Sequence, residues 1–587
     1  MNMERGERPQ GMTCLAVGAL FLAGFAALAM RLKDVQVDQV AALTYDAARQ
    51  SIRRVRVPGA RGRILASGGE VLAANRPARS IVLNAEAFQK RTWASTATNI
   101  FAAVTDAAAV IGRPSHIDIA DIESHLKRKL ARPLVVWRNV TDDELARFSE
   151  HIDALEGFEC EESLERHYPH GTLASHLVGY VGRDRVEAPE GDESVNYIDF
   201  EMRGRGGLEA RYDSFLRGVP GQRCLTVDAR GFAHSEWTQI EPQKGPDLRL
   251  SLDLKLQREA EKQLEGHCGA CVALDPRDGS VLVMASSPGF DPNDFVPTLP
   301  AALWKSLSAD PAKPLMCRAS AGTYAPGSTF KPITAFAGME RGISSGAVYE
   351  CVGAYKIGGV RIRCTRTWGH GDMDLRHALR ESCNPFFCDL GVKAGTNALM
   401  GAARAFGLGA KTGIDFPAEA AGVVPDDEWK REHWGERWYP GDLPQMAIGQ
   451  GMLLVTPLQM ARVAAAIGTG YLVTPHLKAG EPARRKELPF SAAMLRAVRE
   501  GMEMVVDGGT GRRAGDGLAV KIAGKTGTAE VGSGTTRRKN TWFIAYAPAK
   551  NPTLAIAMVI ENGDTGGGTT APKVREILKA RFGEAKS

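Results

Sequence analysis

The sequence predicts an α+β protein in three parts: an apolar N-terminal helix, an extended mixed α/β pedestal, and a C-terminal domain in which an antiparallel sheet carries a large helical insertion. Three observations support this fold class. The chain has 587 residues, too many for one hydrophobic core. Residues 12–30 form an uncharged run. Strand-like apolar segments lie at both ends of the region 246–587, with helical sequence between them.

The N-terminal run, Met12 to Met30, is bracketed by Arg8 and Arg31. At ~1.5 Å per residue it just crosses a hydrocarbon core of about 30 Å, which predicts a transmembrane helix. A cleaved signal peptide is the alternative, because Ala27-Leu28-Ala29 resembles a cleavage site. We favour the anchor, since the run exceeds a usual signal core. Residues 1–11 are then a cytoplasmic tail, and everything after the anchor lies outside the cytoplasm.

Residues 31–245 contain mixed helical and strand-like sequence and no catalytic cluster, so we interpret them as a structural or docking region. Arg53 to Arg63 is a basic stretch, Ser67 to Gly69 is a turn, and 115–165 is charged and favours helix. The pattern of residues changes near Gln243 to Pro246, and this segment is interpreted as a linker between the two regions.

Residues 246–587 begin and end with regular apolar patterns. Leu248, Leu250 and Leu252 alternate as in a strand, and Leu254 to Leu264 is helical. Later segments predict a hairpin, two further strands and a closing helix: Cys271 to Leu274 with Val281 to Met284, then Trp542 to Ala547, Leu554 to Ile560, and Pro572 to Arg581.

Composition excludes one class of function. The formal charge is only +5, and the chain lacks a basic tract with interleaved aromatics, a phosphate-binding loop and a dinucleotide fingerprint. We therefore expect no nucleic-acid partner.

The first chemical signal is Ser328 with Lys331. At a spacing of three the two side chains share one helix face. A serine hydroxyl needs a base, and a desolvated lysine serves because burial lowers its pKa. A helix starting at Ser328 also aims free backbone N–H groups at an incoming carbonyl oxygen. The pair alone is common by chance.

Two further segments strengthen that signal. Ser382-Cys383-Asn384 supplies a hydroxyl that could relay a proton and a carboxamide that could hold a substrate amide. Lys525-Thr526-Gly527-Thr528 follows Leu518 to Ala523, which we expect to be a strand. Lys525 with Thr526 or Thr528 suits a carboxylate, the Thr528 N–H suits an oxyanion, and Gly527 leaves room for an extended substrate.

The order S-x-x-K, S-x-N, K-T-G is the signature of penicillin-recognising serine enzymes. The chain resembles class B penicillin-binding proteins, most closely the elongation-specific penicillin-binding protein 2 type. The resemblance extends to pedestal and catalytic motifs: Arg61 to Ile64, Arg166 to Gly171, Gly206 to Asp213, Asp291 to Asn293, Ile448 to Gly451, Thr456 to Gln459 and Glu561 to Gly563.

That resemblance implies a single-pass enzyme of the inner membrane with a dimerisation-type pedestal (31–245) and a transpeptidase domain (246–587) on the periplasmic side. It implies a D,D-transpeptidase that cross-links stem peptides through a Ser328 acyl-enzyme and is a target of β-lactams. It also implies a multi-pass SEDS-family partner of the RodA type. Alternatives left open are a division-specific transpeptidase, a D,D-carboxypeptidase, a β-lactamase and a penicillin sensor.

A cysteine-rich segment precedes the S-x-N motif. Cys351, Cys364, His370 and Cys383 offer three thiolates and an imidazole, a full tetrahedral zinc set, and elongation-type relatives resemble this segment. We therefore expect structural zinc there, with no cofactor needed for catalysis. A Cys351–Cys364 disulfide and free thiols are the alternatives.

Overall fold

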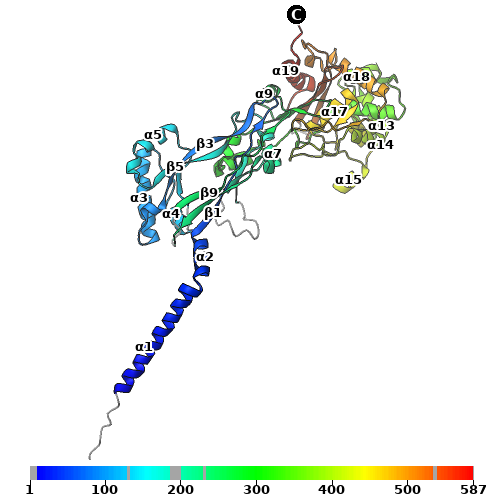
Figure 1. Cartoon of the computed structure of the whole chain (residues 1–587). Helices are drawn as coiled ribbons and strands as arrows, with labels where there is room; N and C mark the ends of the chain where they lie inside the picture. Colours follow the sequence, from blue (N-terminus) through cyan, green and yellow to red (C-terminus); the bar gives the residue numbers. More distant parts are fainter. Residues whose placement is uncertain (1–9, 128–131, 186–199, 229–232, 533–537, 586–587) are drawn as a thin grey trace, which may run out of the picture.

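A computed structural model describes residues 10–127, 132–185, 200–228, 233–532 and 538–585. Its parts follow one another along an elongated molecule (Figure 1). The helix α1 (Gln10–Lys33) contains the predicted anchor and projects alone from the pedestal (Figure 1). Its apolar side chains are exposed to the surroundings, as a membrane-spanning helix requires. Residues 1–9 of the expected cytoplasmic tail lie outside the described residues.

Among the described residues, the pedestal combines three sheets with helices. Its helices are α2 (Val40–Ser51), α3 (Trp93–Ile111), α4 (Ile119–Lys127), α5 (Asp142–Glu150), α6 (Ser175–Val178), α7 (Gly207–Arg211) and α8 (Asp213–Leu216). Its strands are β1 (Ile52–Val57), β2 (Ile64–Leu65), β3 (Val71–Leu83), β4 (Leu134–Trp137), β5 (Phe158–His167), β6 (Val181–Arg185), β7 (Phe200–Gly204), β8 (Gly221–Val227), β9 (Ala233–Ile240) and β10 (Leu248–Arg249).

The sheet orders are β1-β8-β9, β10-β2-β3-β4 with β5 also pairing with β3, and the two-stranded β6-β7. The helix α3 is long and apolar enough to span a membrane, but one side packs into a hydrophobic core with α4 and α5, so we assign it to the pedestal interior. The region 115–165, expected to be helical, also contains β4 and the ten-residue strand β5.

A buried ionic cluster fastens separate pedestal segments together. The Glu209 carboxylate is fully buried and accepts from Arg61 Nε and Arg166 Nε, both at 2.6 Å. Arg61 also donates to Asp213 at 2.7 Å. Buried charges are stable only when paired in this way, so these residues lock the segments in one arrangement.

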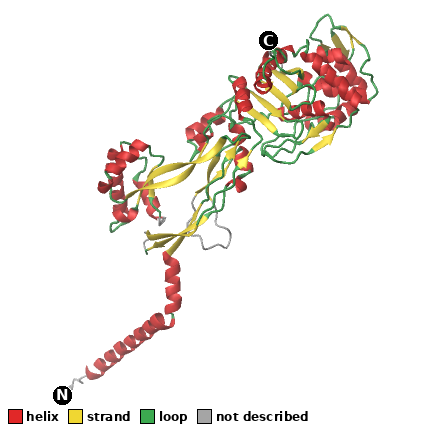
Figure 2. Ribbon diagram, turned by 45° about the horizontal axis from the view of Figure 1, so that its top comes forward, coloured by secondary structure: helices red, strands yellow, loops and turns green. Residues whose placement is uncertain are grey.

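The C-terminal domain is built around a five-stranded sheet of order β12-β11-β21-β20-β19, in which every pairing is antiparallel. These strands are β11 (Gly269–Leu274), β12 (Val281–Ser287), β19 (Ala523–Val531), β20 (Arg538–Ala547) and β21 (Leu554–Ile560). Helices α9 (Leu254–Leu264) and α19 (Ala571–Phe582) pack together beside the sheet (Figure 2).

The helical insertion lies between β12 and β19. Its helices are α10 (Ala301–Ala309), α11 (Lys331–Glu340), α12 (Leu375–Arg380), α13 (Asn384–Ala394), α14 (Thr396–Ala405), α15 (Asp427–Trp434), α16 (Asp442–Ala447), α17 (Pro457–Thr469) and α18 (Ala492–Val506). Its short strands are β13 (Tyr349–Cys351), β14 (Ala354–Ile357), β15 (Val360–Arg363), β16 (Gly371–Met373), β17 (Tyr471–Val473) and β18 (Arg485–Glu487). The observed fold is the α+β class expected from the sequence.

One expected strand is displaced. The apolar segment Leu518 to Ala523 was expected to form a strand before the K-T-G motif, but the strand β19 begins at Ala523 and contains Lys525 to Thr528. Leu518 makes only an isolated bridge with Glu584. The motif is itself sheet because β20 pairs with it residue by residue, from Lys525–Ile544 to Thr528–Thr541.

Candidate active site

Ser328 lies in a 3₁₀ turn, Gly327–Phe330, that leads directly into α11. Gly327 has a φ of 55° and donates its N–H to Gly449 O at 2.8 Å. A Cβ at this position would lie 2.8 Å from Thr528 O, so only glycine lets the turn press against β19 in this conformation. The turn therefore holds Ser328 beside the K-T-G strand, half-exposed.

Lys331 is the first residue of α11 and is fully buried. Its Nζ lies 2.7 Å from Ser382 O, 2.7 Å from Asn384 Oδ1 and 3.2 Å from Ser382 Oγ. Burial lowers the pKa of Lys331 to about 8. A lysine with this pKa is partly neutral near pH 7 and is able to accept a proton.

Ser382 has a φ of 54°, the left-handed region that a non-glycine residue adopts only when its surroundings enforce it. It follows α12, and Asn384 begins α13. Its Oγ accepts from Lys525 Nζ at 2.9 Å and lies within reach of Lys331. The Ser382 hydroxyl thus bridges two buried lysines.

The K-T-G strand contributes from the opposite wall. Burial, and then the nearby Lys331 charge, lower the pKa of Lys525. A Cβ on Gly527 would lie 2.8 Å from Pro326 O, so this glycine also admits the Ser328 turn. Thr526 Oγ1 lies 2.7 Å from Thr510 Oγ1, and Thr528 Oγ1 accepts from Gly566 N at 3.2 Å.

All three motifs meet at one cleft of about 1310 Å³. Six of the expected catalytic residues line it: Ser328, Ser382, Asn384, Thr526, Gly527 and Thr528. Lys331 and Lys525 lie buried beneath, in contact with Ser382. A nucleophile open to solvent above two desolvated amines is suited to acyl transfer.

The cleft also contains residues that sequence reasoning missed. Thr510 and the glycine run Gly566 to Gly568 line it beside β19, and Arg361 and Arg363 line it beside Asn384. The three consecutive glycines after the last strand were a usable signal for a close backbone approach. The arginines offered no such pattern, because their meaning depends on which residues they face.

The expected metal ligands form a compact cluster at the S-x-N end of the cleft. The ligand atoms of Cys351, Cys364, His370 and Cys383 all lie within 4.8 Å of one another. His370 Nδ1 lies 3.3 Å from Cys364 Sγ and 3.7 Å from Cys351 Sγ, and Cys364 Sγ lies 4.0 Å from Cys383 Sγ. A tetrahedron with ~2.3 Å metal–sulfur bonds has edges of roughly 3.8 Å, so the cluster fits one metal ion.

The disulfide alternative finds no support, since the structure pairs none of the ten cysteines with another. Cys268 and Cys271, which have redox-motif spacing, are likewise unpaired.

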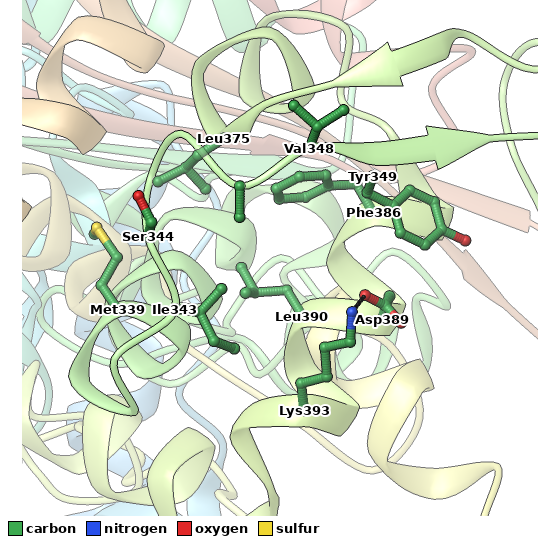
Figure 3. A pocket seen from close by; sticks show the side chains of 11 residues that line it. Met339, Ile343, Ser344, Val348, Tyr349, Leu375, Phe386, Asp389, Leu390 and Lys393 are labelled. Atoms are coloured by element: carbon green, nitrogen blue, oxygen red, sulfur yellow. Dashed lines mark ion pairs between the residues drawn. The ribbon is translucent and has the colours of Figure 1, made fainter.

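A second, smaller and largely apolar cavity lies against a different face of α13 (Figure 3). Phe386 and Leu390 point into it, and the ion pair between Asp389 and Lys393 borders it at 2.7 Å (Figure 3). These two charged groups neutralise each other, and most of the other lining residues are apolar.

Comparisons with known proteins agree with this geometry. Residues 269–579 match the penicillin binding protein transpeptidase domain, and residues 56–250 match the penicillin-binding protein dimerisation domain. The peptidoglycan D,D-transpeptidase MrdA of Acinetobacter baumannii is 32% identical, over 95% of this chain and 85% of that protein.

Solved structures are similar over almost the whole chain. The penicillin-binding protein PBP2 of Helicobacter pylori, in complex with MreC, has a TM-score of 0.77 at 27% identity and covers 90% of this chain and 98% of that one. A chain of a peptidoglycan synthase complex that coordinates polymerization and crosslinking has a TM-score of 0.73 at 30% identity, covering 98% and 99%.

The fold and the site together define a serine transpeptidase of the penicillin-binding class. Within that class, the chain belongs to the class B penicillin-binding protein 2 (MrdA) family, the elongation-type peptidoglycan D,D-transpeptidases.

Proposed function

We propose that Ser328 is the acyl-carrying nucleophile of this transpeptidase, with Lys331 as its base. The observation that carries the proposal is the position of Lys331: fully buried, held between Ser382 and Asn384, and one helical turn after Ser328. Its lowered pKa, about 8, suits proton transfer near neutral pH.

In the first half-reaction, Ser328 Oγ attacks the carbonyl carbon of the penultimate D-Ala and its proton passes to Lys331 Nζ. The Ser328 and Thr528 N–H groups stabilise the oxyanion. As the intermediate collapses, Ser382 passes its proton to the departing amine of the terminal D-Ala and regains one from Lys331 Nζ, 3.2 Å away. Lys525 and Thr526 bind the carboxylate of that D-Ala, and Asn384 holds the substrate amide.

In the second half-reaction an amine of a neighbouring stem peptide attacks the Ser328 ester. That amine loses its proton through the same lysine and serine groups, an amide cross-link forms and Ser328 regains its hydrogen. A β-lactam acylates Ser328 in the same way and remains attached.

Intact-mass spectrometry of the full chain in detergent tests this proposal. Incubation with penicillin should add one drug mass, and the Ser328→Ala variant should add none. Ser306→Ala, at an exposed position on α10, is the matched control and should acylate like the wild type. An adduct on Ser328→Ala, or none on the folded wild type, would reject Ser328.

We further propose that Cys351, Cys364, His370 and Cys383 hold structural zinc. The donor set and its spacing support this, because zinc favours tetrahedral sites of sulfur and nitrogen ligands. When bound, zinc would staple the segment 351–383 against α13; no catalytic step passes through it. Metal analysis before and after chelation tests the site, and fewer than about 0.2 zinc per chain would reject it.

The domain boundaries are proposed as in the sequence: anchor 12–30, pedestal 31–245 and transpeptidase domain 246–587. With α1 as a single membrane anchor, the catalytic domain lies on the periplasmic side of the inner membrane, where stem peptides occur. Protease protection in spheroplasts tests this: external protease should degrade 31–587, and resistance would contradict it.

We also propose a RodA-type SEDS glycosyltransferase as the partner, contacted through the anchor and pedestal. The support is the similarity to a chain of a peptidoglycan synthase complex over 98% of this chain. Copurification from membranes should be lost when an unrelated apolar helix replaces 12–30. Unchanged copurification, with the pedestal also replaced, would contradict the proposal.

A further inference from the structure

Positively charged side chains outnumber negatively charged ones in the lining of the main cleft. The cations are Arg361, Arg363, Arg512, Arg513 and Lys539, and the anions are Glu530 and Asp564. Lys539 and Asp564 pair with each other at 3.7 Å. Across the described residues, no carboxylate pairs with any of the four arginine side chains. The cleft therefore presents guanidinium groups to whatever binds in it.

Two of these arginines share one strand and one direction. Arg361 and Arg363 are exposed on β15, and Ile362 between them is buried. Side chains alternate along a strand, so the two guanidinium groups extend from the same face while Ile362 anchors the other. A planar guanidinium group binds a carboxylate through two parallel hydrogen bonds. Two arginines that have no carboxylate partner of their own are therefore suited to bind one from a ligand.

The position of this pair relative to Ser328 limits which carboxylate it reaches. Arg363 O accepts from Asn384 Nδ2 at 2.9 Å, and Asn384 Oδ1 in turn contacts Lys331. The backbone of Arg363 on β15 is therefore separated from Lys331 by a single residue, Asn384. Thr526 and Arg512, in contrast, belong to the opposite wall, where Thr510 and Thr526 meet.

A stem peptide carries several carboxylates. The terminal one is assigned above to Lys525 and Thr526. The third residue of the stem precedes the acylated D-Ala and lies ~3.5 Å from it along the peptide. The acidic residue before the third one lies further from the acylated D-Ala. If the third residue is diaminopimelate, its side chain ends in a carboxylate beside the amine. If it is lysine, the side chain ends in a bare ammonium group, which arginines repel.

We propose, building on the proposed function, that Arg361 and Arg363 form an anion subsite that binds the side-chain carboxylate of the third stem residue. The subsite makes this transpeptidase prefer stem peptides with a diamino-dicarboxylic acid at that position. The two arginines determine specificity and take no part in bond making.

The test measures how well soluble pentapeptides protect Ser328 of the full chain from a fluorescent penicillin. One pentapeptide has diaminopimelate at its third position, and the second differs only in having that side-chain carboxylate replaced by a carboxamide. The readout is the ratio of their half-protecting concentrations within each variant, so that any change in penicillin reactivity cancels.

For the wild type we expect the carboxylate peptide to protect at roughly threefold to fivefold lower concentration, as one or two exposed charge pairs provide. Arg361→Gln with Arg363→Gln should bring the ratio to about one. Arg341→Gln, an exposed residue outside the cleft, should leave it unchanged.

A wild-type ratio near one would overturn the proposal. So would loss of the ratio in Arg512→Gln with Arg513→Gln but not in the β15 variant, because the selective wall would then be the other one. If wild-type Ser328 takes no label at all, the proposed nucleophile has failed, and that result is distinct from labelling with no preference.

Discussion

The Ser382 hydroxyl accepts a hydrogen bond from Lys525 Nζ at 2.9 Å, which ties the S-x-N turn to the K-T-G strand. Lys331 approaches the same oxygen at 3.2 Å. One hydroxyl therefore connects two amines whose pKa values are both lowered by burial. This arrangement underlies the first two predictions.

Ser382→Ala removes the connecting hydroxyl and leaves the Lys331 contact with Ser382 O intact. We expect penicillin acylation of Ser328 to slow roughly a hundredfold, the usual contribution of a positioned proton-transfer group. Stopped-flow measurement of the acylation rate constant checks this. Ser344→Ala, a serine bordering the second cavity, is the control and should react normally. A Ser382→Ala rate within threefold of wild type would exclude a relay.

Acylation should also depend on pH. Because burial lowers the pKa of Lys331 to about 8, the neutral, proton-accepting form increases as the pH rises and dominates above it. The rate constant should increase by about tenfold per pH unit below that value and level off above it. Rates at pH 6–9.5, corrected for spontaneous penicillin hydrolysis, measure this. A rate that is flat or falls over this range would contradict a lysine base.

Gly327→Ala should disturb the nucleophile turn. The new Cβ would meet Thr528 O at 2.8 Å and would force a φ of 55° on a residue with a side chain. Small displacements of a nucleophile cost roughly tenfold or more in rate. Gly266→Ala is the matched control: its φ is 74°, but nothing lies within 4 Å. It should lose about 1 kcal/mol of stability and acylate normally. Equal acylation by both variants would show that the contact is unimportant.

Cys351→Ala should lower both zinc content and thermal stability. Loss of one ligand of a structural site weakens metal binding and so destabilises the folded state, and in a domain of this size ~2 kcal/mol corresponds to a Tm decrease of roughly 3 °C. Cys388→Ala provides the comparison, since this buried thiol lies outside the ligand set and contacts Pro444 O at 3.5 Å. Equal zinc content in the two variants would remove Cys351 from the site.

Glu209→Gln should destabilise the pedestal by about 3–5 kcal/mol, because it leaves the buried Arg61 and Arg166 without their shared countercharge. Glu236→Gln breaks an exposed pair with Arg223 at 2.7 Å and should cost about 1 kcal/mol or less. Denaturant unfolding compares them. Similar losses in both would mean that the buried cluster does not fasten the pedestal.

Sequence patterns predicted the elements that are built from regular apolar residues, whether one-sided helices or fully buried strands. The helix α9, the strands β11 and β21 and the closing helix α19 lie where periodicity indicated. The strand β19 was displaced because its motif residues are polar yet buried, so hydrophobicity pointed to the preceding segment. The strand β5 was missed because most of its residues are exposed and charged, and its pairing with β3 is visible only in three dimensions.

The site was predictable to the extent that its chemistry resides in short motifs. Spacing alone predicted that Ser328 and Lys331 share one face, and residue types together with the family resemblance predicted the candidate metal ligands. The partners Thr510 and Gly566 come from other segments and are identified by contact. The same limit applies to Arg361 and Arg363, whose role depends on the absence of facing carboxylates among the described residues.

The strand order also constrains when the enzyme becomes active. In the C-terminal sheet β11 lies between β12 and β21, and β19 reaches β11 only through β20 and β21. A growing chain that already contains Ser328, Lys331 and Ser382 still lacks the two strands that seat Lys525 beside them. Because β20 and β21 lie between β19 and β11, the three motifs come together in one sheet-bound site only in a chain that extends at least to Ile560.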